Sequence, residues 1–475
     1  MAPKAPTTEL ATASAVEMAA MVRGKRASPV DITEAVLARI AAKEPLLNAF
    51  VVLDAERAMD AARAAEAAVM RGDELGALHG VPATIKDIQA VAGLPTRRGS
   101  NLSDPTPATA DAPLVARLRA AGAIILGKTT STEQGWTAVS HNPLTGATHN
   151  PWKHGFTAGG SSSGAAALAG AGCGPLHLGT DGAGSIRLPA HFCGAVGFKP
   201  TYGRVPYAPV PNNGALSHAG PITRSVADAA LMFSIMAGPH PADHTTLPDR
   251  FGPEIQSGGL AGLRIAYSPD LGHARVDPDV AAAVAASVRG LAALGARVEQ
   301  VTPLWGPAGP ALERDIWGGA MRPFLAADAA AEARMDPGLV ACTHAYRDFT
   351  FDQAHAAQGR RIAYAAAVNT WFAEGGWDLL VTPAASVAAF PVGLQRPPHW
   401  PGHAPGNEWD WLVWAEFSYP FNLSHGPAIS VPCGLTEGGL PIGLQFAGPR
   451  LADSLVLRAA EAFLAAQPFT VAPAG

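Results

Sequence analysis

Short apolar segments rich in β-branched residues alternate with longer segments of helical periodicity along most of this 475-residue chain. Helical spacing is clearest after Asp111 as far as Gly122, and again over about 277–294. Strands that alternate with helices of this length are typical of layered α/β folds. The pattern predicts an α/β fold with a central mixed, mostly parallel sheet covered by helices. The strand-like segments are residues 81–85, 123–126, 263–268, 296–301, 377–383, 428–433 and 442–448.

The first eighty residues carry a helical pattern instead. Asp31 is placed to cap a helix with apolar residues at helical spacing, and an alanine-rich stretch over about 54–71 ends at Gly72. We expect this region to wrap the core from outside. One domain is therefore predicted over 1–475, with a helical wrap (1–75), a core that holds the candidate site (76–240), and the rest of the sheet with pocket segments (260–470).

Composition excludes several classes of protein. Hydrophobic residues make up 48% of the chain, enough for a substantial core. The net charge is −5, only 15% of residues are charged, and no basic cluster occurs, so no nucleic-acid partner is expected. No apolar stretch reaches the roughly 18 residues of a membrane span, and no secretory leader is recognisable. We expect a cytoplasmic protein with no membrane contact.

Metal and cofactor chemistry find no support in the sequence. The four cysteines, Cys173, Cys193, Cys342 and Cys433, are far apart and lack the spacing of a zinc site. The glycine-rich stretches match neither GxxxxGK[ST] nor GxGxxG. No metal and no cofactor are predicted.

Two glycine-rich loops that carry serines lie close together, "GGSSSG" at 159–164 and "GTDGAGSIRLPA" at 179–190. The small residues that follow the first suit a helix packed closely on a sheet rather than a flexible linker. In the second, Gly182, Ala183 and Gly184 leave little bulk over the backbone N–H groups. These donors, with that of Ser185, can point at a developing oxyanion. The second loop predicts a serine acyl-transfer site.

A serine nucleophile needs a base, and two kinds of residue fit. The chain has 15 histidines, but it has no GxSxG elbow, and the sequence places none of them beside Ser185. Lys86 ends the strand-like run that begins at residue 81, although many lysines in such a position simply reach water. The residues alone leave both bases open.

Lys86 and the two serine loops together resemble the amidase signature family. The likeness runs from about residue 15 to 465 and includes segments 118–130, 221–232 and 420–448. The resemblance implies an amidohydrolase that cleaves the carbon–nitrogen bond of a small carboxamide through a seryl acyl-enzyme. It assigns Ser185 as nucleophile, Ser161 as bridging serine at a cis peptide bond, and Lys86 as base.

Neighbouring residues complete the expected site. Gly159 and Gly160 make the turn before Ser161 accessible, and Asp181 and Arg187 are expected to fix the nucleophile loop by hydrogen bonds. Many members of the family read "TDTGGS" where this chain reads "TDGAGS", which puts a methyl group at Ala183. Because alanine keeps its N–H, we expect the oxyanion site to survive.

The assigned role makes a strong demand on Lys86. Lowering its pKa from about 10.4 to about 7 takes roughly 4–5 kcal/mol, which burial can supply. The carboxylate of Asp87 would oppose this shift if it faced the same way. Strand alternation should place it on the opposite face.

Two other functions remain as alternatives: the A-type glutaminase component of a tRNA-dependent amidotransferase, and a non-catalytic binding protein. The chain departs from these A-type components at 342–366 and at Ala415, whereas a binding protein would not need Lys86, Ser161 and Ser185 together.

The substrate side of the site is expected in variable segments, here 133–145, 206–219, 310–360 and 396–419. Trp136, Trp411 and Trp414 are candidates for an apolar substrate pocket, although such aromatic residues also form cores. A mild preference for aryl or hydrophobic amides follows. Family likeness and symmetry favour a homodimer.

Overall fold

The computed structural model describes residues 7–211, 213–252, 254–256, 258–401 and 409–469. The 396–419 segment expected near the substrate therefore lies partly outside the described residues. The helices are α1 Thr7–Thr12, α2 Ala15–Arg23, α3 Pro29–Leu47, α4 Ala55–Arg71, α5 Pro113–Ala120, α6 Ser163–Gly170, α7 Arg187–Cys193, α8 Val226–Met236, α9 Pro278–Ala293, α10 Gly309–Met321, α11 Ala329–Glu332, α12 Pro337–Ala345, α13 Phe351–Gly375, α14 Pro420–Leu423 and α15 Asp453–Ala466.

Eleven strands form one central sheet in the order β1-β3-β2-β6-β8-β7-β12-β13-β11-β9-β10. Strands from both halves of the chain pair within it, because β7 lies beside β12. This continuity supports the proposal of a single domain. The strands are β1 Phe50–Leu53, β2 Pro82–Lys86, β3 Ile124–Thr129, β6 Leu176–Asp181, β7 Val196–Lys199, β8 His218–Thr223, β9 Arg264–Tyr267, β10 Arg297–Gln300, β11 Leu379–Pro383, β12 Ala428–Leu435 and β13 Pro441–Ala447; β4 His141–Asn142 and β5 Gly146–Ala147 form a separate pair.

The α/β class and the mixed sheet agree with the sequence prediction, but the sheet is less parallel than expected. Parallel pairing joins β3, β2 and β6, and separately β11, β9 and β10. The six other pairings between the described strands of this sheet are antiparallel. Antiparallel neighbours can be joined by a short turn, as residues 436–440 join β12 to β13, whereas parallel neighbours need a crossover.

The predicted elements are present with some shifted ends. Helix α4 begins after its N-cap Asp54 and ends at Gly72, which is left-handed, as predicted. Helix α3 begins earlier than expected: Ser28 is its N-cap, and Asp31 forms the other half of the capping box. The N-terminal region is also not purely helical, because β1 forms the edge of the sheet beside β3. Its four residues are too few for a clear alternating pattern.

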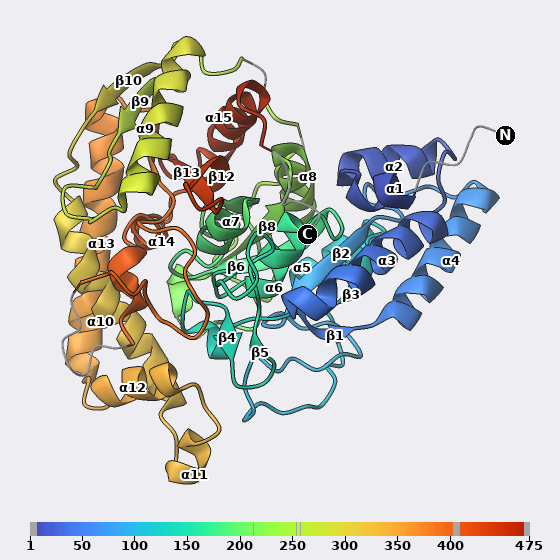
Figure 1. Cartoon of the computed structure of the whole chain (residues 1–475), viewed down its shortest axis with the longest axis horizontal. Coiled ribbons are helices and arrows are strands. Elements are labelled where there is room, and N and C mark those ends of the chain that lie inside the picture. The colour runs from blue at the N-terminus through green and yellow to red at the C-terminus, as the bar shows by residue number, and fades with distance from the viewer. Residues whose placement is uncertain (1–6, 212, 253, 257, 402–408, 470–475) are drawn as a thin grey trace.

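Helices cover the sheet and extend beyond it at both ends. Figure 1 shows α1–α4 grouped at one end of the molecule and α10, α12 and α13 at the opposite end. One buried apolar cluster packs the helices around α6 onto the sheet. A second, rich in tryptophan, lies among α10, α13 and the segment 409–423.

The sheet order brings the two predicted loops to one place. Strands β2 and β6 are parallel neighbours, so their carboxyl ends lie at the same edge of the sheet. Lys86 is the last residue of β2, and Asp181 is the last residue of β6. The loop before α6 and the loop before α7 both lie at this edge, which fixes where the site forms.

Close packing of α6 gives a test of the fold. A Cβ atom at Gly164 would lie 2.1 Å from the carbonyl oxygen of Ala49 and 2.8 Å from the backbone nitrogen of Thr130. We expect Gly164→Ala to lower the free energy of unfolding by about 2–3 kcal/mol through overpacking. Gly359, in α13, meets nothing within 4 Å, so Gly359→Ala should raise it by about 0.5–1 kcal/mol. Denaturant unfolding followed by tryptophan fluorescence measures both, and equal stabilities would contradict the packing described.

Candidate active site

Lys86 ends a fully buried strand, and its own side chain is completely buried. Its Nζ atom lies 2.7 Å from Ser161 Oγ and 2.9 Å from Thr180 Oγ1. Among the described residues, the amine thus contacts neutral oxygen atoms and is paired with no carboxylate. Burial lowers the pKa of Lys86 well below its ordinary value, while the charge of Asp181 opposes this shift. A neutral amine in this position can accept a proton.

The neighbouring carboxylate of Asp87 is bound to a different cation. Asp87 Oδ1 lies 3.0 Å from Lys128 Nζ, and both side chains are fully buried. Lys128 comes from β3, next to β2 in the sheet. Asp87 therefore forms its ion pair with Lys128, and its position agrees with the alternation expected from the sequence.

Ser161 is held by a tightly packed glycine turn. The peptide bond between Gly160 and Ser161 is cis. A Cβ atom at Gly159, which has φ +77°, would lie 2.6 Å from the Phe192 ring. At Gly160 it would lie 2.5 Å from the Val139 carbonyl oxygen. Side chains larger than hydrogen do not fit at either position, which explains the two glycines before Ser161.

Ser185 lies in the loop between β6 and α7, and its side chain faces the same cavity as Ser161. We call this the serine cavity. Within the described part of the chain no hydrogen bond joins the two hydroxyls. Hydrogen bonds of a catalytic relay are often loose before substrate binds. A backbone hydrogen bond of 3.3 Å from Ser162 N–H to the Ser185 carbonyl oxygen ties the two loops together.

The backbone around Ser185 offers fewer free donors than the sequence suggested. The N–H of Gly184 donates to Asp181 Oδ1 at 2.7 Å, so it is occupied. The N–H groups of Gly182, Ala183 and Ser185 donate to no described residue. Ala183 does not have a positive φ angle, so its methyl group imposes no backbone strain. Three of the four expected donors remain available for an oxyanion.

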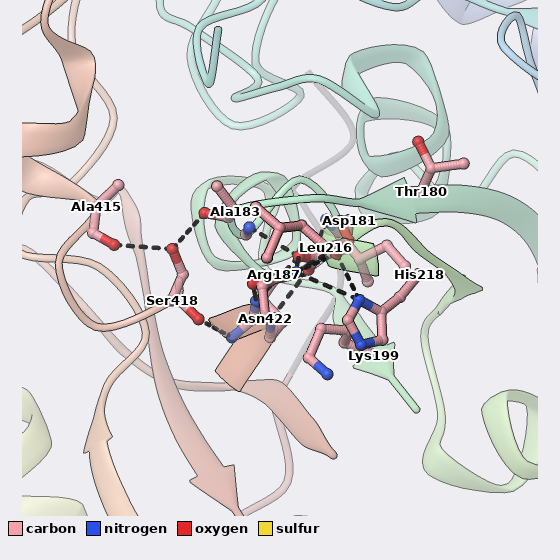
Figure 2. Close-up of polar contacts among 12 residues, drawn as sticks. Thr180, Asp181, Ala183, Arg187, Lys199, Leu216, His218, Ala415, Ser418 and Asn422 are labelled. Carbon is pink, nitrogen blue, oxygen red and sulfur yellow. Dashed lines mark hydrogen bonds and ion pairs between the residues drawn. The ribbon is translucent and has the colours of Figure 1, made fainter. Parts of the chain in front are cut away.

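A buried ion pair fixes this loop from behind. Arg187 binds Asp181 through two hydrogen bonds of 2.9 Å, one to each carboxylate oxygen. Figure 2 shows Asn422 beside this pair, and its amide also donates to Asp181 Oδ1 at 2.9 Å. Burial opposes ionisation of Asp181, but the Arg187 guanidinium holds the pKa of this carboxyl well below its usual range. Asp181 therefore stays ionised, and its hydrogen bonds with Arg187 and with the Gly184 N–H hold the loop.

Sequence reasoning missed several residues that touch these groups. Thr180, the residue before Asp181, supplies the second oxygen beside Lys86, and Ser162 Oγ accepts from the Thr180 N–H at 3.2 Å. Ser418 donates to the carbonyl oxygen of Ala183 at 2.6 Å and so orients the peptide that follows it (Figure 2). Thr180 lies within the quoted motif and could have been noticed, but Ser418 is more than 200 residues away in the chain and gives no local signal.

The serine cavity is narrow, with a volume of about 40 Å³, room for only a few water molecules. Described residues from three of the four segments expected near the substrate, 133–145, 206–219 and 310–360, contribute to its walls. The described residues that line it are Ile88, Arg98, Gln134, Gly135, Ser161, Thr180, Gly182, Ser185, Tyr207, Pro209, Val210, Pro211, Asn213, Ser217, Trp317 and Met321.

The three tryptophans expected to line the pocket lie behind it instead. Trp136, Trp411 and Trp414 are almost completely buried in the second core cluster and do not reach the serine cavity. The wall residue is Trp317, whose indole N–H donates to the Trp136 carbonyl oxygen at 2.9 Å. Trp411 donates to the same oxygen at 2.9 Å. The spacing of these tryptophans in the sequence could not show which of them line the cavity and which are packed in the core behind it.

The described residues were also compared with the requirements of a metal site and of a membrane span. Among the described residues, no group of three or more His, Cys, Asp or Glu side chains is arranged to hold a metal ion. No helix in the described ranges is long and apolar enough to cross a membrane.

Comparisons with known proteins show which family the chain is similar to. A model of the amidase family matches residues 31–457. The acylamidase of Rhodococcus erythropolis is 41% identical over 465 residues, 96% of each chain. The A-type component of the glutamyl-tRNA(Gln) amidotransferase of Salinispora arenicola (strain CNS-205) is 35% identical over 502 residues, 98% of this chain and 99% of that one.

Comparison of the fold with solved structures also indicates the amidase family. The crystal structure of a bacterial aryl acylamidase of the amidase signature family matches with a TM-score of 0.88 and 30% identity, over 96% of this chain and 97% of that one. Sequence and fold thus agree over nearly the whole length. The protein belongs to the amidase signature family and is a hydrolase that acts on carbon–nitrogen bonds.

Proposed function

We propose that this protein is an acylamidase that hydrolyses amides through a Ser185 acyl-enzyme, with Ser161 as proton relay and Lys86 as base. The observation that carries the proposal is the buried amine of Lys86, which has no carboxylate partner in the described part of the chain and lies 2.7 Å from a hydroxyl that shares a cavity with Ser185. A non-catalytic binding protein would gain nothing from this arrangement, because burying a lysine without a counter-charge is costly.

The proposed reaction begins with two proton transfers. Neutral Lys86 takes the proton of Ser161 as Ser161 takes that of Ser185, and Ser185 Oγ attacks the amide carbonyl carbon. The N–H groups of Gly182, Ala183 and Ser185 then stabilise the oxyanion. Return of the proton through Ser161 to the amide nitrogen lets the carbon–nitrogen bond break and the amine leave. Water, activated by the same relay, hydrolyses the ester and restores Ser185.

Aryl amides are the substrate class that we favour. One relative is named an acylamidase and a similar structure is an aryl acylamidase. Trp317, Met321 and Tyr207 give the serine cavity an apolar and aromatic wall. Because the cavity is small, the carbonyl group fits beside Ser185 while the rest of the substrate extends outward.

An A-type component of an amidotransferase is the less supported function. The relative with that name is 35% identical, against 41% for the acylamidase. Ala415 is buried in the tryptophan-rich cluster and does not line the serine cavity, whereas the A-type components tend to carry an acidic residue at this position. The homodimer and the cytoplasmic location remain predictions from the sequence.

The serine loop contains its own matched control. Ser161→Ala, Ser185→Ala and Lys86→Met should each lower kcat/KM for 4-nitroacetanilide by about 10³-fold or more, because residues of a relay act as a unit. Ser163 is buried, but its hydroxyl has no hydrogen-bond partner among the described residues. Ser163→Ala should therefore retain activity.

Labelling identifies the nucleophile independently of turnover. A fluorophosphonate should react with the unmodified enzyme, and mass mapping should find the label on Ser185. Labelling of another serine, or full turnover by Lys86→Met, would overturn the proposal.

The pH profile should report on Lys86. Below its pKa in the folded protein Lys86 is protonated and cannot act as a base, so kcat/KM should fall as pH falls through that pKa. Because burial lowers this pKa, activity should persist well below the ordinary lysine value of about 10.4. Acetanilide, which does not ionise in this range, avoids a contribution from the substrate. An acidic limb centred near 10 would contradict a buried neutral base.

A further inference from the structure

Arg98 lines the serine cavity, and its side chain has no partner among the described residues. The residue is partly buried on the wall that also holds Ile88 and Gln134. Its guanidinium makes no hydrogen bond or ion pair with a described residue. Of the described residues that line this cavity, Arg98 alone carries a full charge. An unpaired cation beside the proposed nucleophile is therefore available to a ligand.

The backbone holds Arg98 in place. Arg98 has a φ of 51°, a left-handed conformation that is uncommon for residues other than glycine. Its N–H donates to the Asp87 carbonyl oxygen at 3.1 Å, and its carbonyl oxygen accepts from Gln134 N–H at 2.8 Å. Gln134, also with a φ of 51°, lines the same cavity. Unfavourable conformations kept by surrounding contacts cluster at functional sites.

Two buried carboxylates near the site are already bound to other cations. Asp87 pairs with Lys128 at 3.0 Å, and Asp181 pairs with Arg187 at 2.9 Å. The remaining polar groups on the cavity wall, including Gln134, Asn213 and Tyr207, are uncharged. The charge of Arg98 thus acts on whatever enters the cavity.

We infer that Arg98 selects amide substrates that carry a carboxylate, which its guanidinium binds while the amide carbonyl lies at Ser185. The guanidinium presents paired N–H donors that match a carboxylate, and such charge-assisted bonds are stronger than neutral ones. This inference rests on the proposed amidase function and narrows its substrate class to amides of dicarboxylic acids or of amino-carboxylic acids.

Two matched substrate pairs test it. For the acyl half, the 4-nitroanilides of succinic acid and of 4-methylpentanoic acid have similar shapes, but only the first is anionic. For the amine half, 4-acetamidobenzoate is compared with 4-isopropylacetanilide. The carboxylate should raise kcat/KM by about 10- to 100-fold in at least one pair, and high salt should reduce the gain.

Three variants assign the preference to a residue. Arg98→Gln should remove most of the advantage of the anionic substrate over its neutral partner, and Arg98→Lys should keep part of it. Both keep the backbone hydrogen bonds of residue 98, which come from its N–H and carbonyl groups. Arg97→Gln is the matched control: it removes the same charge from a neighbour that does not line the cavity, and should leave the ratio unchanged.

The possible results separate the two proposals. If neither carboxylate substrate is preferred, or if the preference survives Arg98→Gln, the inference about Arg98 is wrong while the amidase function stands. If no anilide is hydrolysed and Ser185 is not labelled by a fluorophosphonate, the proposed function itself fails.

Discussion

The architecture of the site depends on a buried lysine amine that has no carboxylate partner among the described residues. Such a group is costly to bury charged, so burial favours its neutral form. The Lys86 amine instead forms hydrogen bonds with two hydroxyl groups, one of Ser161 and one of Thr180. The Lys86 side chain is itself completely buried, so the amine is not exposed to bulk solvent. The fold thus supplies the proton acceptor that the proposed serine chemistry needs.

Keeping that amine uncharged requires that nearby carboxylates be bound elsewhere. Asp87 follows Lys86 directly and pairs with Lys128 from the neighbouring strand. Asp181 ends the strand on the other side and is held by Arg187 and Asn422. The negative charge of Asp181 still opposes the lowering of the Lys86 pKa, but the positive charge of Arg187 partly neutralises the Asp181 carboxylate. The same ion pair also fixes the loop that carries Ser185. One interaction therefore both neutralises the Asp181 charge near Lys86 and positions Ser185.

This arrangement also shows which part of the site is adaptable. The proposed triad and the ion pairs beside it lie at the carboxyl ends of β2 and β6, where close packing around glycines leaves little freedom. Other walls of the cavity come from α10 and from residues 207–211 and 213–217, together with Arg98 and Gln134. Changes in those walls can alter the accepted amide without disturbing the proposed proton relay, which agrees with the general separation of a rigid scaffold from variable binding loops.

By itself the sequence determined the α/β class, most of the strands and the identity of the residues proposed to react, because these depend on local patterns and on the two serine loops. Only the tertiary structure decided how the strands pair, since β1 is too short to show an alternating pattern and pairs such as β7 with β12 join segments distant in the chain. The structure also showed which side chains line the serine cavity and which belong to the core behind it. Trp317 and Arg98 line the cavity, whereas Trp136, Trp411 and Trp414 lie in the core. Side-chain direction follows from packing and hydrogen bonds between distant segments, which no local pattern records. The Gly184 N–H donates to Asp181, three residues away, whose carboxylate is also bound by Arg187 and by the distant Asn422.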